Sequence, residues 1–312
     1  DFNLDKKRKS KIISLAYSSQ QDIDAMTMKV FTRQKLLGYG NFANVYEVLC
    51  HINNKNYSLK QLPKVNILKR KALAMLWSER DMMIYNSLHI KDSPFIIQLK
   101  WAFQNSIDCC LVMDLAEGGD LSAILYKHVI EKRKLNSLNG HSNEDESMNE
   151  EDILYTRSLL PTKYQLQGFD ESQVQLIAAE IILALEALHQ QYVLYRDLKP
   201  KNICITTEGH IALTDFGLAT VIKDDSYYLA PHRVGTPGYM APEIASGYGY
   251  TFTADYFSLG ATIYELLHGL TPFDNKKFRR ISKMKASDIN LWSYSISSSL
   301  SSNCHDLLNS LL

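Results

Sequence analysis

The stretch that decides the expected fold is Tyr195-Arg196-Asp197-Leu198-Lys199-Pro200-Lys201-Asn202, which is followed by Thr214-Asp215-Phe216-Gly217. Asp215 lies 18 positions after Asp197, a spacing that fits a hairpin between a loop and a turn that each carry one carboxylate. Asp197 is suited to orient a hydroxyl nucleophile, whereas Asn202 and Asp215 offer the oxygen ligands that Mg²⁺ prefers. In this order and spacing, the two runs predict phosphoryl transfer.

A glycine-rich stretch, Leu37-Gly38-Tyr39-Gly40-Asn41-Phe42-Ala43-Asn44-Val45, is a candidate phosphate-binding loop. Glycines such as Gly38 and Gly40 let backbone N–H groups approach phosphates closely. Ala43 replaces the third glycine of the G-x-G-x-x-G pattern, so we expect a modest loss of ATP affinity. Because strands are predicted on both sides of the loop, the pattern does not indicate a dinucleotide-binding fold.

Three further charged residues belong to the same predicted chemistry. Lys60 ends the predicted strand Tyr57-Ser58-Leu59-Lys60, and its ammonium can hold ATP phosphates if an acidic partner fixes it. Glu79, 19 positions later on a predicted helix, is the candidate partner. The alternative is a pair of surface charges, whose interaction would contribute about 0–1 kcal/mol. Lys199, two residues after Asp197, can neutralise charge on the transferred group.

Composition restricts the class of protein. The chain has 312 residues, 46% of them hydrophobic, which is enough for two units with substantial cores. The 34 basic and 34 acidic side chains cancel, so binding to nucleic acid through bulk charge is not indicated. The five cysteines form no C-x-x-C pair and suggest neither a disulfide framework nor a zinc site. No apolar run reaches about 18 residues, so no membrane span is expected.

The order of segments predicts a domain layout. A polar N-terminal extension covers 1–30, and its basic cluster Lys6-Lys7-Arg8-Lys9 fits a solvated arm or a membrane-surface contact. Strands over 45–49, 57–60, 96–103 and 109–114 and a helix over 72–88 are predicted for a β-rich part at 31–113. The part at 114–312 is expected to be helical, with a helix over 174–190 behind the N-cap Asp170 and a disordered acidic insertion at about 127–167.

These motifs together resemble the eukaryotic serine/threonine protein kinases over roughly residues 31–312. Ser93-Pro94-Phe95-Ile96-Ile97 and Tyr195 are similar to the AGC group. The runs Ala178–Leu183, Gly235–Glu243 and Ala254–Gly260 are most similar to the G-protein-coupled-receptor kinases, in their β-adrenergic-receptor-kinase branch.

The resemblance implies an α+β, bilobal fold with a small β-rich N-lobe, a larger helical C-lobe and ATP with Mg²⁺ as cofactors. Met83, Leu99, Tyr195 and Phe216 would form a hydrophobic spine anchored by Asp255. Ser58 stands where an alanine usually covers adenine. The implied nucleotide contacts are Leu37, Gly38, Gly40, Val45, Ser58, Lys60, Met113, Asp114, Ala116, Asp120 and Cys204.

Three departures from the family pattern affect regulation and specificity. His232 stands where many AGC kinases carry an activating phosphothreonine, so activation by that phosphate is not expected. Lys201 occupies a position that is acidic in arginine-directed relatives, although Glu265 is retained and favours basic substrates. The arginine expected to pair with Glu243 does not occur before Leu312, so we expect a C-terminally truncated kinase domain.

Function is expected to be transfer of the ATP γ-phosphate to Ser or Thr hydroxyls of proteins, with activated G-protein-coupled receptors as a substrate class implied by the resemblance. The alternatives are a nucleotide-binding pseudokinase, favoured by Ala43 and Ser58, and a scaffold that binds partners through residues 127–167. We expect a trimmed piece of a cytoplasmic protein, and recruitment to the membrane surface would require regions outside this sequence.

Overall fold

The computed structural model describes residues 28–39, 43–69, 72–138, 168–222, 233–247, 249–273 and 294–312. Side chains of residues 133–138 are not included in this description. The chain forms two compact units, the first made of residues 1–119 and 205–220, and the second of residues 120–204 and 221–312. Each unit has its own core, and the two are described separately.

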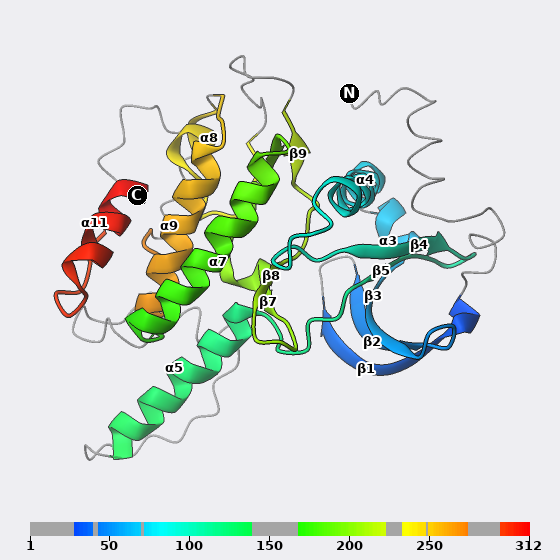
Figure 1. Ribbon diagram of the computed structural model, residues 1–312, viewed down its shortest axis with the longest axis horizontal. Helices are drawn as coiled ribbons and strands as arrows, with labels where there is room; N and C mark the ends of the chain where they lie inside the picture. The colour runs from blue at the N-terminus through cyan, green and yellow to red at the C-terminus, as the bar shows by residue number, and fades with distance from the viewer. Residues whose placement is uncertain are drawn as a thin grey trace. The chain divides into compact units, whose positions relative to one another are not determined.

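Unit 1 is built on a five-stranded antiparallel sheet with strand order β1-β2-β3-β5-β4 (Figure 1). Its strands are β1 (Phe31–Tyr39), β2 (Asn44–Cys50), β3 (Lys55–Pro63), β4 (Leu99–Gln104) and β5 (Asp108–Met113). The 3-10 helix η1 (Met28–Val30) precedes β1. Aromatic and aliphatic side chains pack on one face of the sheet, where Phe31, Val48, Tyr57, Leu59 and Val112 are buried. The strands predicted over 45–49, 57–60 and 109–114 are therefore confirmed, and the strand predicted over 96–103 begins later, at Leu99.

Two helices follow β3 in unit 1, namely α3 (Lys64–Lys69) and α4 (Leu73–His89). Figure 1 shows α4 beside the sheet, with its N-terminal end near α3. Met82, Met83 and Glu79 are buried along α4, whereas Leu73 and Trp77 are about half exposed. The helix predicted over 72–88 is thus confirmed to within a residue at each end.

A later segment of the chain completes unit 1. After η3 (Pro200–Asn202) and β7 (Ile203–Ile205), the backbone of Ile205 exchanges hydrogen bonds of 2.9 and 3.0 Å with Gly118 and Gly119. Leu213, in β8 (Ile211–Leu213), donates to Phe95 at 2.8 Å and accepts from Ile97 at 3.0 Å. These hydrogen bonds hold the turn that carries Asp215 in unit 1.

Unit 2 is mainly helical. Its helices are α5 (Leu121–Leu138), α7 (Glu171–His189), α8 (Pro242–Ser246), α9 (Thr253–His268) and α11 (Ser302–Leu311), and it also holds the short strand β6 (Val193–Leu194). The strand β9 (Thr220–Val221) lies at the unit boundary. Helices α7 and α9 lie side by side, and α11 packs on α9 (Figure 1). At Gly260 of α9, an added Cβ would lie 2.7 Å from Leu311 Cβ, so glycine permits this close approach.

The helix α7 begins with the predicted N-cap. Asp170 and Gln173 form a capping box, in which each side chain meets the backbone N–H of the other residue. By length and composition α7 could cross a membrane, since an 18-residue window has a mean hydropathy of 1.2. Core helices of soluble proteins satisfy the same criteria, and Ile181, Leu185 and Leu188 are fully buried in unit 2.

The structure corrects one expected boundary. The disordered insertion predicted from about residue 127 does not begin there, because α5 continues through Leu138. Leu121, Leu125 and Val129 recur at helical spacing and are buried, so they hold this helix on the core of unit 2. Residues 139–167 of the predicted insertion, and residues 1–27 of the predicted extension, lie outside the described residues.

Candidate functional site

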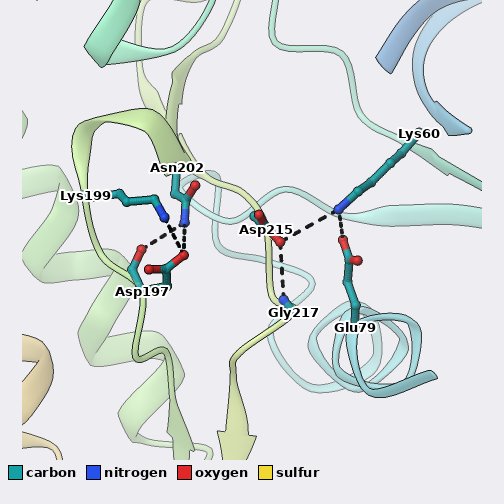
Figure 2. A network of polar contacts seen from close by, with 7 residues as sticks. All are labelled: Lys60, Glu79, Asp197, Lys199, Asn202, Asp215 and Gly217. Atoms are coloured by element: carbon teal, nitrogen blue, oxygen red, sulfur yellow. Dashed lines mark hydrogen bonds and ion pairs between the residues drawn. The ribbon is translucent and has the colours of Figure 1, made fainter. Parts of the chain in front are cut away.

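In unit 1, the sheet and α4 bring three predicted site residues together. Lys60 lies on the central strand β3, opposite Val45 of β2 and Leu111 of β5. Its ammonium forms an ion pair with the carboxylate of Glu79, and Asp215 Oδ1 lies 3.7 Å from Lys60 Nζ (Figure 2). One cation is therefore shared by a buried carboxylate and a partly exposed one.

Electrostatics favours a charged lysine at this place. Burial alone would lower the pKa of Lys60, but the carboxylates of Glu79 and Asp215 outweigh burial and raise it. Burial raises the pKa of Glu79, and the ammonium of Lys60 opposes that effect. The pair thus presents a fixed positive charge of the kind that binds phosphate oxygens.

Asp215 has a backbone conformation that exposes its carboxylate. Its φ of 55° lies in the left-handed region, which non-glycine residues adopt only rarely. The backbone N–H of Gly217 donates to Asp215 Oδ1 at 3.4 Å, and 46% of the Asp215 side chain is exposed (Figure 2). The left-handed backbone at Asp215 and one backbone hydrogen bond therefore place a partly exposed carboxylate beside Lys60.

In unit 2, three side chains hold the carboxylate of Asp197 (Figure 2 shows two of them). Lys199 Nζ lies 2.7 Å from Asp197 Oδ2, and Asn202 Nδ2 donates to the same oxygen at 2.9 Å. The hydroxyl of Thr236 donates to Oδ1 at 2.6 Å and accepts from Lys199 Nζ at 2.7 Å. Asp197 is only 8% exposed, so these contacts fix the direction of its carboxylate.

The loop that carries Asp197 is anchored by Asp255 of α9. This carboxylate is completely buried and accepts from the backbone N–H groups of Tyr195 and Arg196 at 2.9 and 2.8 Å. His189 Nε2 lies 2.9 Å from Asp255 Oδ2. Arg196 has a left-handed φ of 68°, and its guanidinium donates to the hydroxyl of Tyr250 at 3.0 Å.

A glycine places Thr236 against this loop. Gly235 has a φ of 122°, and a Cβ on it would lie 3.0 Å from the carbonyl oxygen of Arg196. Both the positive φ and the close approach disfavour a side chain here. The chain can therefore pass near Arg196 and bring the Thr236 hydroxyl to Asp197.

The predicted nucleotide contacts are distributed over both units. Unit 1 holds Leu37, Gly38, Val45, Ser58, Met113, Asp114 and Ala116; unit 2 holds Asp120 and Cys204; and Gly40 lies outside the described residues. Ser58 is buried, and so is Ala43, whose methyl group is thereby accommodated in unit 1.

Two acids among these predicted contacts already have protein partners. The Asp114 N–H donates to Gln98 O at 3.1 Å, and its carboxylate pairs with Lys100 at 2.9 Å. Asp120 Oδ1 accepts from Ala123 N at 2.9 Å and so caps α5. A cap is thus a structural role for Asp120, and its contact with the ribose stays a prediction.

The predicted magnesium ligands are oxygen donors. Within the described residues, no group of three or more His, Cys, Asp or Glu side chains could hold a metal ion by itself. This fits Mg²⁺, which commonly uses one or two protein ligands together with phosphate oxygens and water. Because Asn202 Nδ2 donates to Asp197, the amide oxygen of Asn202 is the atom suited to a cation, as are the carboxylate oxygens of Asp215.

Sequence reasoning missed two residues that support the site. His189, on α7, contacts Asp255 across a separation of 66 residues, and Tyr250 receives the Arg196 guanidinium across 54. Neither lies in a run that suggested chemistry, so no local signal could have identified them.

Comparison with known proteins identifies relatives over most of the chain. The family model for the protein kinase domain matches residues 31–141 and 146–312. "G protein-coupled receptor kinase 1" of Caenorhabditis briggsae is 34% identical over 83% of this chain and 33% of its own length. "G protein-coupled receptor kinase 2" of Caenorhabditis elegans is 34% identical over 92% of this chain and 35% of its own.

A third relative belongs to another branch of the same group. "cAMP-dependent protein kinase type 3" of Saccharomyces cerevisiae is 36% identical over 77% of this chain and 49% of its own length. The predicted resemblance to the AGC group is thereby confirmed. The chain spans between a third and a half of the length of these three relatives.

Proposed function

Because this chain belongs to the protein kinase domain family, we propose that the full-length protein transfers the γ-phosphate of ATP to Ser or Thr hydroxyls of proteins. The observation that carries this proposal is the carboxylate of Asp197, held by Lys199, Asn202 and Thr236 at 2.6–2.9 Å. A carboxylate fixed in this way can accept a hydrogen bond from the acceptor hydroxyl and aim it at the phosphate.

Each remaining site residue has a role in the proposed reaction. Lys199, next to the carboxylate that receives the hydroxyl, stabilises charge on the transferred phosphoryl group. Lys60, kept charged by Glu79 and Asp215, binds ATP phosphates. Asp215 and Asn202 would hold Mg²⁺, which neutralises phosphate charge when bound. Protein side chains thus provide both the direction of attack and the charge stabilisation.

Phosphate transfer by the full-length protein tests this proposal. Peptides that differ only in carrying Ser, Thr, Tyr or Ala as the acceptor are incubated with Mg²⁺ and ATP, and products are measured by mass spectrometry. We expect phosphate on Ser and Thr peptides, and Asp197→Asn should lower kcat by roughly 10²–10⁴. Asp306→Asn, which changes an exposed carboxylate on α11, is the matched control.

A pseudokinase would give a different result. Stabilisation of the protein by Mg-ATP in thermal unfolding, with no transfer to any peptide and no effect of Asp197→Asn, would contradict the proposal. The carboxylate of Asp197, held by Lys199, Asn202 and Thr236, supports an enzyme over that alternative, because nucleotide binding alone does not need an oriented carboxylate.

We further propose receptors coupled to G proteins as substrates, which the names of two relatives support. The test measures phosphate incorporated into a purified receptor with and without its agonist. Incorporation that does not depend on agonist would contradict it. We also propose a cytoplasmic location, because ATP and the cytoplasmic segments of the proposed receptor substrates are both available there.

A further inference from the structure

Unit 1 contains a groove whose lining residues, apart from Asp114, have no role in the proposed reaction. Its volume is about 500 Å³, and it is lined by residues of the segments 55–56, 94–97, 114–117 and 206–212, all of which belong to unit 1. Ile96, Ile97 and Ala212 are buried and form an apolar floor. A groove of this volume is large enough for several side chains of a peptide.

Backbone hydrogen bonds fix the walls of this groove. In the turn that carries Glu208, Thr206 N donates to His210 O at 2.8 Å. Elsewhere in the wall, Asp114 N donates to Gln98 O at 3.1 Å. The groove is therefore formed before a ligand arrives, and binding does not have to order it.

The rim of the groove carries negative charge that the described part of the chain neutralises only in part. Three carboxylates line the groove, and Lys100 pairs with one of them, that of Asp114, at 2.9 Å. Glu117 and Glu208 are exposed and form no ion pair with the described residues, and Lys55 is the single ammonium among the described lining residues. Such a groove suits a ligand that has cations next to apolar side chains.

The N-terminal segment of this chain has that composition. Five cations are followed directly by Ile12 and Ile13, and the cations are Lys6, Lys7, Arg8, Lys9 and Lys11. These residues lie outside the described part of the chain, which begins at Met28. The basic cluster therefore has a complementary surface within its own unit.

The described chain begins close to the groove. Phe31 pairs with Cys50, and Cys50 pairs with Lys55, which lines the groove. Neighbouring strands are about 4.8 Å apart, so Phe31 lies roughly 10 Å from Lys55. Lys11 is 17 positions before Met28, and a chain of that length spans at most about 60 Å. The basic segment can therefore reach the groove of its own molecule.

We propose that the basic segment 6–13 binds in this groove of the same molecule, with its cations at Glu117 and Glu208 and its two isoleucines on the apolar floor. Because the contact is intramolecular, an effective concentration in the millimolar range fills a site that would hold a separate peptide only weakly. Asp114 and Leu115 also line the groove, so the bound segment braces the residues just before Ala116, a predicted nucleotide contact. This inference goes beyond the proposed function and does not depend on phosphate transfer.

Disulfide trapping in the full-length protein tests the contact. Ser10→Cys is combined with Thr207→Cys, which changes an exposed lining residue next to Glu208, and mild oxidation is followed by digestion and mass spectrometry. We expect a cross-link between positions 10 and 207 within one molecule. The matched control combines Ser10→Cys with Glu131→Cys, an exposed position of α5 in unit 2, and should give a much lower yield.

Charge reversal shows whether the carboxylates of the rim hold the segment. One exposed ion pair changes binding by up to about fivefold, so Glu117→Lys with Glu208→Lys should lower the cross-link yield by roughly five- to twenty-five-fold. Lys6→Glu with Lys9→Glu should lower it as well, and the four substitutions together should restore it. Restoration excludes misfolding as the cause of either loss. The yield should also fall as salt rises to about 0.5 M, because salt screens exposed charges.

Each other outcome overturns the proposal in a specific way. A yield no higher than that of the α5 control means that the segment does not occupy the groove. A cross-link between two molecules means that a second copy supplies the occupant. Sedimentation of the protein with vesicles of phosphatidylserine and phosphatidylcholine, together with no cross-link, assigns the segment to a membrane surface. An intact cross-link without phosphate transfer contradicts the proposed function alone and leaves this inference standing.

Discussion

Replacement of Asp255 by Asn should loosen the loop that carries Asp197 while it preserves the shape of the side chain. The carboxylate is completely buried and accepts from Tyr195 N, Arg196 N and His189 Nε2 at 2.8–2.9 Å. The amide that replaces this carboxylate keeps one acceptor oxygen, but its NH₂ group replaces the other oxygen and faces an N–H donor that it cannot accept from. The loss of one hydrogen bond to a charged group costs about 1.5–3 kcal/mol, and the donor left unpaired costs about 1–3 kcal/mol.

The summed effect of Asp255→Asn is therefore about 2.5–6 kcal/mol, a range that includes the ~3–5 kcal/mol typical of a broken buried charge interaction. Hydrogen exchange measured by mass spectrometry on the peptide that spans residues 193–198 should show protection lower by roughly 10²–10⁴. Phosphate transfer should fall as well, because Arg196 no longer keeps its left-handed φ of 68° and Asp197 follows it in the chain.

The matched control for Asp255→Asn is Asp306→Asn, which removes the same charge from an exposed position. Protection in the Asp255 variant within about threefold of this control would refute the reasoning, since Asp255 would then not hold the loop. His189→Leu offers a milder test, because it removes one of the three donors and leaves the two backbone bonds in place.

Three further predictions follow from buried polar groups. Asn86→Val should raise the free energy of unfolding by about 1–3 kcal/mol in urea titrations, because neither polar atom of the buried Asn86 side chain has a hydrogen-bond partner among the described residues; a loss of stability would contradict this. Glu79→Gln should lower phosphate transfer and cost up to about 3 kcal/mol, since it leaves the partly buried ammonium of Lys60 with only Asp215 as a charged partner; an unchanged urea midpoint would argue against the ion pair with Glu79. Burial lowers the pKa of His268 from its ordinary value of 6.5, so its contribution to stability is complete above pH 6.5 and is lost as pH falls through the lower folded value; unfolding of His268→Gln should show a shallower loss between pH 6.5 and 5, and parallel curves would refute it.

Local patterns carried much of the prediction from sequence. The helix over 72–88 followed from apolar residues at helical spacing, and the N-cap Asp170 followed from the residue type at the start of α7, whereas the capping box with Gln173 was not predicted. The pairing of Lys60 with Glu79 was expected because Lys60 ends a predicted strand and Glu79 lies on the helix that follows it, an order typical of the protein kinase fold. Such features depend on residues close in sequence or on a short series of motifs.

Long-range contacts escaped sequence reasoning. Asp255 contacts His189, which is 66 residues away in the sequence, because α7 and α9 pack together. The sequence of one helix does not determine which other helix packs against it. The prediction that a disordered insertion begins at about residue 127 was wrong for a different reason. Leu125 and Val129 continue the helical spacing of α5, but the polar and acidic residues that follow outweighed this signal in the composition.

The segment 205–220 has a consequence for how the protein is made. Unit 1 needs the hydrogen bonds that Ile205 and Leu213 give to residues 95–119, yet these two residues are synthesised only after 120–204. At about 5–20 residues per second, a ribosome needs roughly 5–20 seconds between residue 119 and residue 220. During that interval unit 1 lacks its last segment, and Lys60 lacks Asp215. A chaperone that holds nascent chains should therefore engage this protein while unit 2 is still emerging.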